Sequence, residues 1–302
     1  MTMTGLSERG RPRDHLLVDP AWLAGRLDDP DVRIVDMRGS VRTVTTEPGH
    51  QEATYLGAPE EYAAGHIPNA IYLDWTRDIV DPHDPVPAQV ASPERFAAEL
   101  GRRGIGDGHL VVAYDAHPSS QFATRLWWAL RYYGHQRVAM LDGGFNAWQR
   151  EGRPLTTEQP SFPPAVFTPR AQSAWRATGE EVLAALGQPD ITLIDARDEG
   201  QYGGTLRRGE GRAGHIPGAV NVPREAIVDP ATGRFRDDDA LRRAFAAAGI
   251  DGSKHVIAYC NGGVAATSVL FGLALAGYPA LTNYDGSWNE WGSRAEWPVE
   301  LG

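Results

Sequence analysis

At 302 residues, the chain is long enough to form two domains that each bury a full core. Its net charge of -10, without a basic stripe, argues against binding to nucleic acid. The single cysteine excludes a disulfide framework, a cysteine-rich zinc site and dithiol redox chemistry within one chain.

The first residues, MTMTGLSERGRPRDH, contain no apolar segment of the secretory kind. No apolar run approaches the ~18–20 residues that are needed to cross a bilayer. From the sequence we therefore expect a cytoplasmic protein without a membrane partner, and we leave its oligomeric state open.

Five sequence blocks occur twice, in the same order, in the two halves of the chain. The spacing between the blocks is also similar: His66 and Asp115 are 49 positions apart in the first half, and His215 and Cys260 are 45 positions apart in the second. This agreement indicates an internal duplication. The matched pairs are VRIVDMR (32–38) and ITLIDAR (191–197), GHIPNAIYLDW (65–75) and GHIPGAVNVPR (214–224), HLVVAYD (109–115) and HVIAYC (255–260), FATRLWWALRYYGH (122–135) and AATSVLFGLALAGY (265–278), and LDGGFNAW (141–148) and YDGSWNEW (284–291).

In each half, short apolar strands alternate with amphipathic helices. This order predicts an α/β fold of two tandem domains, each with a mainly parallel sheet flanked by helices. Between the halves, residues 152–170 are rich in proline and lack helical periodicity, so they read as an extended linker. We expect an N-terminal domain at 1–155, a linker at 156–168 and a C-terminal domain at 169–302.

Cys260 stands where the apolar run at 256–258 gives way to a glycine-containing loop. Gly262 and Gly263 permit a tight turn that approaches a bound group closely, and a helical pattern begins at Ala265. Free backbone N–H groups and the positive end of a helix dipole favour an anion at such a junction. We therefore expect a reactive thiolate in an anion cradle. The alternative is a small buried hydrophobic residue at a strand end.

The first half has Asp115 in place of the cysteine, and AHPSSQ follows it instead of a glycine-rich loop. An aspartate at a helix N-terminus stabilises structure but is not a sulfur nucleophile. We therefore expect the first half to be catalytically inactive and to provide one wall of the site.

These motifs resemble the tandem-domain rhodanese family, the thiosulfate and 3-mercaptopyruvate sulfurtransferases. The resemblance covers nearly the whole chain. It rests on the two GHIP blocks, the Asp-x-Arg after a strand in each half, the LDGGFNAW and YDGSWNEW blocks, and one cysteine that opens a six-residue loop in the second half only.

The resemblance implies two rhodanese-like α/β domains, with the active cysteine in the C-terminal one. It implies that the Cys260 thiolate takes a sulfane sulfur from a small-molecule donor, thiosulfate or 3-mercaptopyruvate. The resulting persulfide then passes the sulfur to cyanide or a thiol acceptor, and neither a cofactor nor a metal is expected. The loop amides would bind the persulfide and substrate. The residues assigned to this role are Asn261, Gly262, Gly263, Val264 and Ala265.

Arg197 and Asp195 match the family's Asp-x-Arg, which makes Arg197 a candidate substrate-binding residue. We favour the alternative, a salt bridge between the two that fixes the loop after the strand. Gln201 stands where the family usually carries a further substrate-binding arginine. Three arginines in the insertion before the second GHIP block either supply this charge or are solvated loop charges: Arg207, Arg208 and Arg212.

The small, neutral loop CNGGVA leans toward 3-mercaptopyruvate as donor by resemblance, but Gly262 replaces the loop serine of that group. The donor therefore stays open. We expect His66 and His215 of the GHIP blocks to be structural, because the block occurs in both halves and the nucleophile in only one. Trp288 and Trp291 are expected to be core or pocket-wall residues.

Two other functions compete with sulfur transfer. A cysteine phosphatase or arsenate reductase needs an arginine six positions after the cysteine, where this chain has Ala266. A non-catalytic sulfur carrier or regulatory module is the other alternative, and the neutral Gln201 motivates it.

Overall fold

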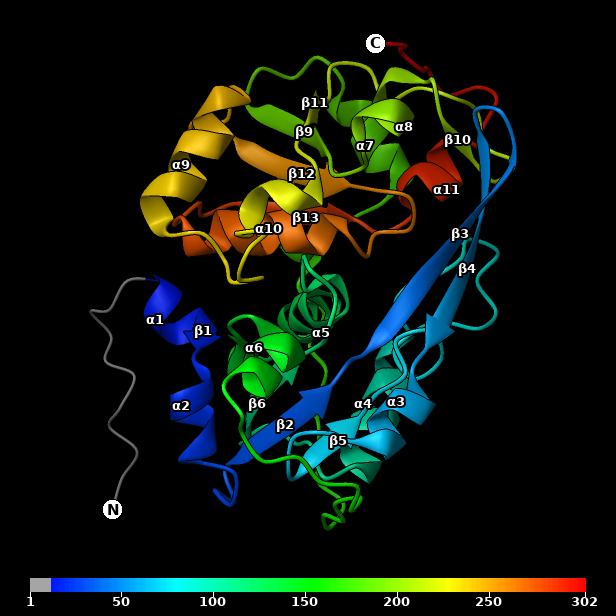
Figure 1. Ribbon diagram of the computed structural model, residues 1–302. Coiled ribbons are helices and arrows are strands. Elements are labelled where there is room, and N and C mark those ends of the chain that lie inside the picture. The colour runs from blue at the N-terminus through cyan, green and yellow to red at the C-terminus, as the bar shows by residue number, and fades with distance from the viewer. Residues whose placement is uncertain (1–11) are drawn as a thin grey trace.

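Two five-stranded parallel sheets dominate the computed structural model, which describes residues 12–302 (Figure 1). The first half forms a sheet with the order β1-β7-β6-β2-β5, and the second half forms one with the order β11-β9-β12-β13-β8. Every strand pairing in both sheets is parallel. The predicted fold, two α/β units of the same kind, is confirmed, and we call them the first and second unit.

The elements of the two units follow one another in a similar order along the chain. The first unit contains α1 (Pro12–Leu16), β1 (Leu17–Val18), α2 (Pro20–Ala24), β2 (Val32–Asp36), α3 (Pro59–Ala64), β5 (Ala70–Tyr72), α4 (Pro93–Arg102), β6 (Leu110–Tyr114), α5 (Gln121–Tyr132), β7 (Val138–Leu141) and α6 (Gly144–Arg150). The second contains η1 (Ser173–Trp175), β8 (Arg176–Ala177), α7 (Gly179–Ala185), β9 (Ile191–Asp195), α8 (Glu199–Gly203), β11 (Val220–Asn221), η2 (Arg224–Ile227), α9 (Asp238–Ala247), β12 (His255–Tyr259), α10 (Ala266–Leu275), β13 (Leu281–Tyr284) and α11 (Ser287–Trp291). No helix within residues 12–302 is long and apolar enough to span a bilayer.

The central strands are buried on both faces, as expected for parallel sheets that are covered by helices. All five residues of β2 are buried; Val35 packs into the largest core cluster and Ile34 into another. The largest cluster contains residues of both units, and α5 and α10 pack against each other within it. Thr124 of α5 lies 3.0 Å from Thr267 of α10, between their hydroxyl oxygens. The two units therefore share the largest core cluster, and each also has a smaller cluster of its own.

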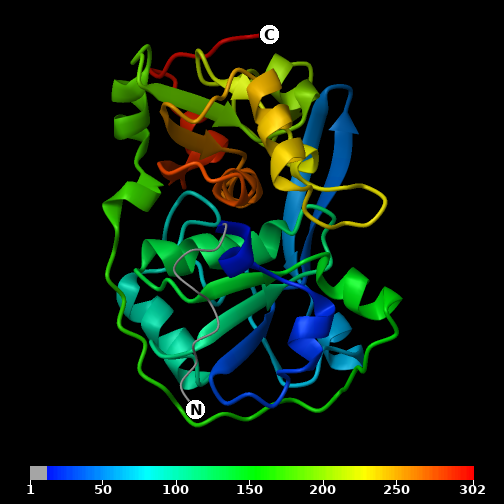
Figure 2. The ribbon, with the colours of Figure 1, turned by 90° about the vertical axis from the view of Figure 1, so that its left-hand side faces the viewer.

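A long segment without helix or strand, residues 151–172, connects α6 to η1. It runs around the outside of the first unit before it enters the second (Figure 2). Its backbone is bonded to that unit, for example by two hydrogen bonds of 2.9 Å between His66 and Thr156. The expected linker lies inside this segment, and its boundaries at 156 and 168 stay a prediction.

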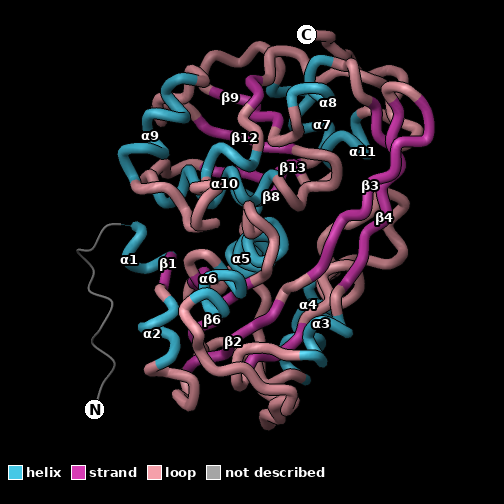
Figure 3. Tube along the Cα trace, in the orientation of Figure 1, coloured by secondary structure: helices cyan, strands magenta, loops and turns pink. Residues whose placement is uncertain are grey.

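An antiparallel hairpin of β3 (Gly39–Glu47) and β4 (His50–Gly57) projects from the first unit along one side of the second (Figure 3). At its far end, β10 (Arg207–Arg208) of the second unit pairs with β4 in parallel, with Arg207 opposite His50. Sequence reasoning does not single out this hairpin, although its Pro48–Gly49 turn is a recognisable signal. The hairpin links the two units on the side where the site lies.

Candidate active site

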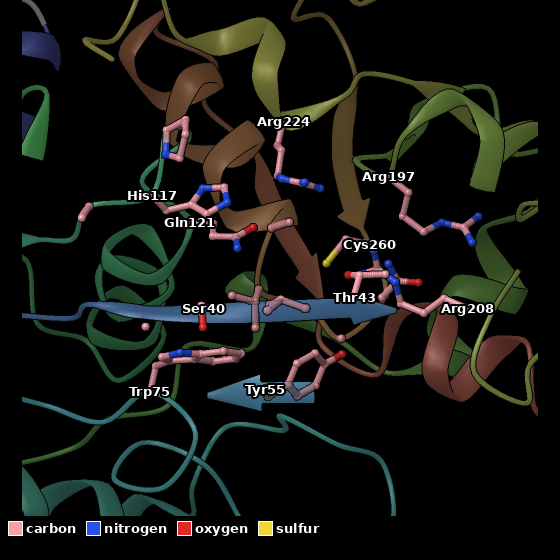
Figure 4. Close-up of a pocket in the computed structure, with 18 residues that line it drawn as sticks. Ser40, Thr43, Tyr55, Trp75, His117, Gln121, Arg197, Arg208, Arg224 and Cys260 are labelled. Atoms are coloured by element: carbon pink, nitrogen blue, oxygen red, sulfur yellow. The ribbon is translucent and has the colours of Figure 1, made fainter. Parts of the chain in front are cut away.

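A cavity of about 310 Å³ lies between the two units, bounded by the β3–β4 hairpin (Figure 4). Its other walls are the loop after β6 in the first unit and the loop after β12 in the second. Both loops follow the carboxyl ends of central strands, which is where parallel sheets bind ligands. The first unit thus supplies part of the wall, as the sequence predicts.

Cys260 follows β12 directly, and its side chain borders the cavity (Figure 4). The residue is only 3% exposed, so the sulfur meets the cavity rather than bulk solvent. Its N–H donates to Ser287 Oγ at 3.1 Å, and its carbonyl accepts the Trp288 N–H at 3.0 Å. Cys260 is therefore a thiol held in a fixed position against a cavity, as nucleophilic attack on a bound substrate requires.

The backbone N–H groups of residues 261–265 meet no hydrogen-bond acceptor in the described part of the chain. Helix α10 begins immediately after them and has no capping side chain. Open donors at a helix N-terminus bind anions. The loop from Asn261 to Ala265 therefore has the open donors that the sequence predicts, next to Cys260.

The carbonyl groups of this loop are bonded to the surrounding protein. The Gly263 carbonyl accepts hydrogen bonds from Arg125 Nη1 at 3.1 Å and from Asn283 Nδ2 at 3.0 Å. The Asn261 carbonyl accepts the Asn289 N–H at 2.8 Å. In a planar trans peptide the carbonyl and the following N–H point in opposite directions. Because the carbonyls of Asn261 and Gly263 face their hydrogen-bond donors, the N–H groups that follow them in the chain point in the opposite direction.

Arg125 reaches this loop from helix α5 of the first unit. Its Nη1 lies 2.6 Å from Asp285 Oδ1, and both side chains are 1% exposed. The other oxygen of Asp285 accepts the Val90 N–H at 3.0 Å and lies 3.3 Å from Arg176. One buried arginine thus contacts both a carboxylate and the Gly263 carbonyl, and it couples the first unit to the shape of the second unit's loop.

In the first unit, Asp115 supplies an acceptor to the equivalent loop. Its carboxylate accepts N–H groups of His117 at 2.8 Å and of Phe122 and Ala123 at 2.9 Å each. Burial raises the pKa of Asp115 from 3.8 to about 7, although these N–H groups oppose the shift. The loop N–H groups that have no acceptor in the second unit therefore have one in the first unit, the carboxylate of Asp115.

Among the described residues that border the cavity there are three arginines and no acidic side chain. Arg197, the predicted substrate-binding arginine, places Nη2 at 2.6 Å from Asp195 and at 2.7 Å from the Gly214 carbonyl. In Figure 4 its guanidinium points away from Cys260. The geometry favours the salt-bridge interpretation, and direct contact between Arg197 and substrate stays a prediction.

The fold separates the other arginines of the insertion. Arg208 borders the cavity, whereas Arg207 does not, and Arg212 donates to three main-chain carbonyls near α11. Gln201 is 1% exposed, and its Oε1 accepts a hydrogen bond from Asn261 Nδ2 at 2.8 Å. Gln201 therefore supports the first residue of the loop.

The histidines of the GHIP blocks are not among the residues that border the cavity. His66 stacks on Tyr62 and His215 on Tyr202, each with ring centroids 3.8 Å apart. Their Nδ1 atoms lie 2.8 and 2.9 Å from the carbonyl oxygens of the same tyrosines. These contacts agree with structural roles. Both tryptophans of the YDGSWNEW block are buried in the second unit's core.

Sequence reasoning does not single out several residues of the cavity wall. Arg224 is the last residue of the second GHIP block and lies just beyond the carboxyl end of β11, a position that marks ligand contacts in parallel sheets. Burial and the charge of Arg224 lower the pKa of His117 to about 4. The Ser119 N–H donates to His117 Nδ1 at 3.2 Å, so the neutral ring carries its proton on Nε2. The hairpin contributes Ser40, Val41, Thr43 and Tyr55 to the wall of the cavity.

Within residues 12–302, no cluster of three or more His, Cys, Asp or Glu side chains could hold a metal ion.

The chain matches known proteins over most of its length. The sequence-family model of the rhodanese-like domain matches this chain twice, at residues 19–151 and 178–294. The sulfur carrier protein TtuD of Thermus thermophilus is 34% identical, over 97% of this chain and 99% of that protein. A putative thiosulfate sulfurtransferase of Mycobacterium tuberculosis is 38% identical, over 80% of this chain and 88% of that protein. The crystal structure of SseA from Escherichia coli, which is described among 3-mercaptopyruvate sulfotransferases, is 31% identical, with a TM-score of 0.78 and coverage of 90% of this chain and 98% of SseA.

Proposed function

The chain belongs to the rhodanese family as a tandem-domain sulfurtransferase, and we propose that Cys260 is the residue that carries the sulfur. In this proposal Cys260 accepts a sulfane sulfur from thiosulfate or 3-mercaptopyruvate, and cyanide or a thiol removes it. Both donors are small anions, which suits a cavity of about 310 Å³ that is bordered by arginines.

The transfer takes place in two displacement steps. With thiosulfate, the Cys260 thiolate attacks the outer sulfur, the S–S bond breaks, and sulfite leaves with the electron pair. With 3-mercaptopyruvate, the C–S bond breaks, and the carbon takes the electron pair and the thiol proton to give pyruvate. In both cases a persulfide anion remains on Cys260. The acceptor then attacks the terminal sulfur and restores the thiolate.

The observation that carries this proposal is the position of Cys260 beside the open N–H donors of residues 261–265. The thiolate is negative before the first step, and the persulfide is negative after it. Preorganised donors stabilise such charge without having to reorganise, and one donor of this kind contributes about 3 kcal/mol in comparable sites. An aliphatic pocket would supply no such stabilisation.

The first unit is catalytically inactive in this proposal and serves as a wall and a support. Asp115 cannot carry a sulfane sulfur, and its carboxylate already accepts N–H groups of its own loop. Arg125, by contrast, reaches the Gly263 carbonyl and so supports the loop of the other unit.

A sulfur carrier without steady-state turnover is the second candidate function. The name of TtuD, which matches 97% of this chain, favours it. In a carrier, Cys260 would be loaded and unloaded by partner proteins rather than by small molecules. We also propose a cytoplasmic location for either function, because a single free thiol persists in a reducing compartment.

Replacement of Cys260 by serine tests the proposal, with thiocyanate production from thiosulfate and cyanide as the assay. The wild type should turn over, and the serine variant should fall to the uncatalysed rate with unchanged circular dichroism and thermal unfolding. Sulfur transfer by the variant would rule out the mechanism. A wild type that accepts one sulfur on Cys260 but fails to turn over with any donor would favour the carrier. Comparing kcat/KM for thiosulfate and 3-mercaptopyruvate then identifies the donor.

A further inference from the structure

The segment that follows Asp115 in the first unit, AHPSSQ (116–121), faces the same cavity as the Cys260 loop. Two of its polar side chains, His117 and Gln121, border that cavity. The sulfur-transfer steps described above give neither side chain a role. Polar groups that are buried without an internal partner call for an explanation, and a ligand in the cavity is one.

Gln121 is the first residue of α5 and is only 5% exposed. Within the described part of the chain, its carboxamide makes no hydrogen bond, although it is held away from bulk water. In Figure 4 the carboxamide points into the cavity. An amide that is buried without a partner costs free energy, which a hydrogen-bonding ligand would offset.

His117 is partly buried and carries no charge at neutral pH. Burial, together with the charge of Arg224, lowers its pKa to about 4. That arginine has its own carboxylate partner, Glu225, at 3.0 Å. The Nδ1 of His117 accepts the Ser119 N–H at 3.2 Å, so Nε2 carries the proton, and this N–H meets no acceptor among the described residues. The ring therefore offers one free donor and no charge.

The cavity has two sides of different chemistry around Cys260. In Figure 4, Arg208 lies on one side of Cys260, and His117 and Gln121 lie on the other. The side with His117 and Gln121 offers two neutral groups, an imidazole N–H and a carboxamide. A carboxamide donates and accepts at the same time, which matches another amide. This side therefore suits an uncharged, hydrogen-bonding group.

We propose that His117 and Gln121 form a neutral subsite for the sulfur acceptor, a small thiol that carries uncharged amide groups. This inference rests on the proposed function, because the acceptor meets the persulfide that the donor leaves on Cys260. The carboxamide of Gln121 would pair with an amide of the acceptor, and the Nε2–H of His117 would donate to a carbonyl oxygen. A cavity of about 310 Å³ is at the lower end of small-molecule sites, so it admits a small thiol rather than a folded protein.

The subsite acts on the second displacement step. The acceptor reacts as its thiolate, after its proton has passed to solvent. Its sulfur attacks the outer sulfur of the Cys260 persulfide, the S–S bond breaks, and the electron pair returns to Cys260 as the thiolate. The acceptor leaves as a persulfide anion. Holding its amides fixes the approach of the attacking sulfur, whereas an acceptor without an amide gains nothing from the subsite.

Sulfur removal from preloaded protein tests the subsite. The protein is loaded with thiosulfate, freed of excess reagent and checked by mass spectrometry for one added sulfur on Cys260. The second-order rate constant of removal is then measured for N-acetylcysteinamide, ethanethiol and cyanide. Gln121→Leu and His117→Phe should each lower the constant for N-acetylcysteinamide about fivefold or more, because each removes a hydrogen bond. The constants for ethanethiol and cyanide should not change.

Gln149→Leu is the matched control, because Gln149 is exposed on α6 and does not border the cavity. This variant should react as the parent does with all three acceptors. Equal slowing for all three acceptors in the cavity variants, or no slowing for N-acetylcysteinamide, would overturn the subsite. Should Gln121→Leu fail to fold, His117→Phe decides by itself.

Two further measurements separate this inference from the proposed function. Loading by thiosulfate should proceed at the parent rate in Gln121→Leu and His117→Phe, and slower loading would contradict an acceptor role. In the Cys260→Ser protein, binding of the unreactive S-methyl-N-acetylcysteinamide, followed by NMR, should weaken about fivefold when Gln121→Leu is added. Unchanged binding would overturn the subsite. A parent protein that never gains sulfur on Cys260 would refute the proposed function, and the binding result would still stand.

Discussion

Replacing Arg125 by methionine tests whether the first unit shapes the Cys260 loop. The guanidinium contacts Asp285 at 2.6 Å, the Gly263 carbonyl at 3.1 Å and the Ala88 carbonyl at 2.7 Å. Methionine fills much of the same volume but can donate to none of these groups. The substitution therefore removes the link between α5 and the loop and leaves a carboxylate buried.

The expected loss of stability follows from the burial of this ion pair. Removing one partner of a buried pair costs roughly 3–5 kcal/mol, because the remaining charge is uncompensated. Asp285 retains Arg176 at 3.3 Å and the Val90 N–H at 3.0 Å. We therefore expect the lower end, a loss of about 3 kcal/mol in the free energy of unfolding. Turnover should also fall, because the Gly263 carbonyl keeps only Asn283 as a donor.

Urea unfolding followed by tryptophan fluorescence measures this loss. Arg131→Met is the matched control, because Arg131 lies on the same helix and has no carboxylate partner in the described structure. Adding Asp285→Asn to Arg125→Met should recover part of the loss, since the amide removes the buried charge. A loss in Arg125→Met no larger than that in Arg131→Met, or no recovery in the double variant, would show that the buried pair with Asp285 does not stabilise the fold.

Three further predictions follow from the site. Asp115→Asn should change the pH dependence of stability. The stabilisation from protonated Asp115 is complete below pH 3.8 and is lost as pH rises through about 7. Over this interval the free energy of unfolding of the variant should therefore rise relative to that of the wild type. Parallel curves in urea unfolding at several pH values would contradict it. Arg224→Met should raise the pKa of His117 from about 4, because a nearby positive charge is lost, and NMR titration of the imidazole measures this; burial should still hold it below 6.5. Gly263→Ala should abolish most turnover, because φ is +69° there and a Cβ would lie 2.7 Å from the Asp285 carbonyl oxygen; full activity would show that the loop tolerates a different shape.

Features that depend on local patterns were predictable from the sequence. Apolar runs of strand length, alternating with amphipathic helices, predict both parallel sheets. Glycines after Cys260 and a helix soon afterwards predict the loop with open donors. The substitution of Asp115 for cysteine in the repeated block predicts that the two corresponding loops differ, and in the first unit the carboxylate does accept N–H groups of its own loop. Each of these signals lies within a few residues of the feature that it predicts.

Contacts between segments far apart in the chain were not predictable in this way. Arg125 and Asp285 are 160 positions apart, and neither residue carries a local signal for the other. The position of Arg208 at the cavity depends on the pairing of β10 with β4, a tertiary contact between short strands. The salt bridge between Arg197 and Asp195 joins residues only two positions apart, and it was the interpretation that the motif favoured. Only the folded chain shows that, of the three arginines at the cavity, Arg208 has no ion-pair partner among the described residues.

Mass spectrometry of the protein after brief treatment with thiosulfate tests whether Cys260 carries the transferred sulfur. The peptide containing Cys260 should gain the mass of one sulfur atom. Cyanide should then remove this sulfur and release an equal amount of thiocyanate. Sulfur transfer by a wild-type protein whose Cys260 peptide never gains that mass would show that Cys260 is not the sulfur-carrying residue.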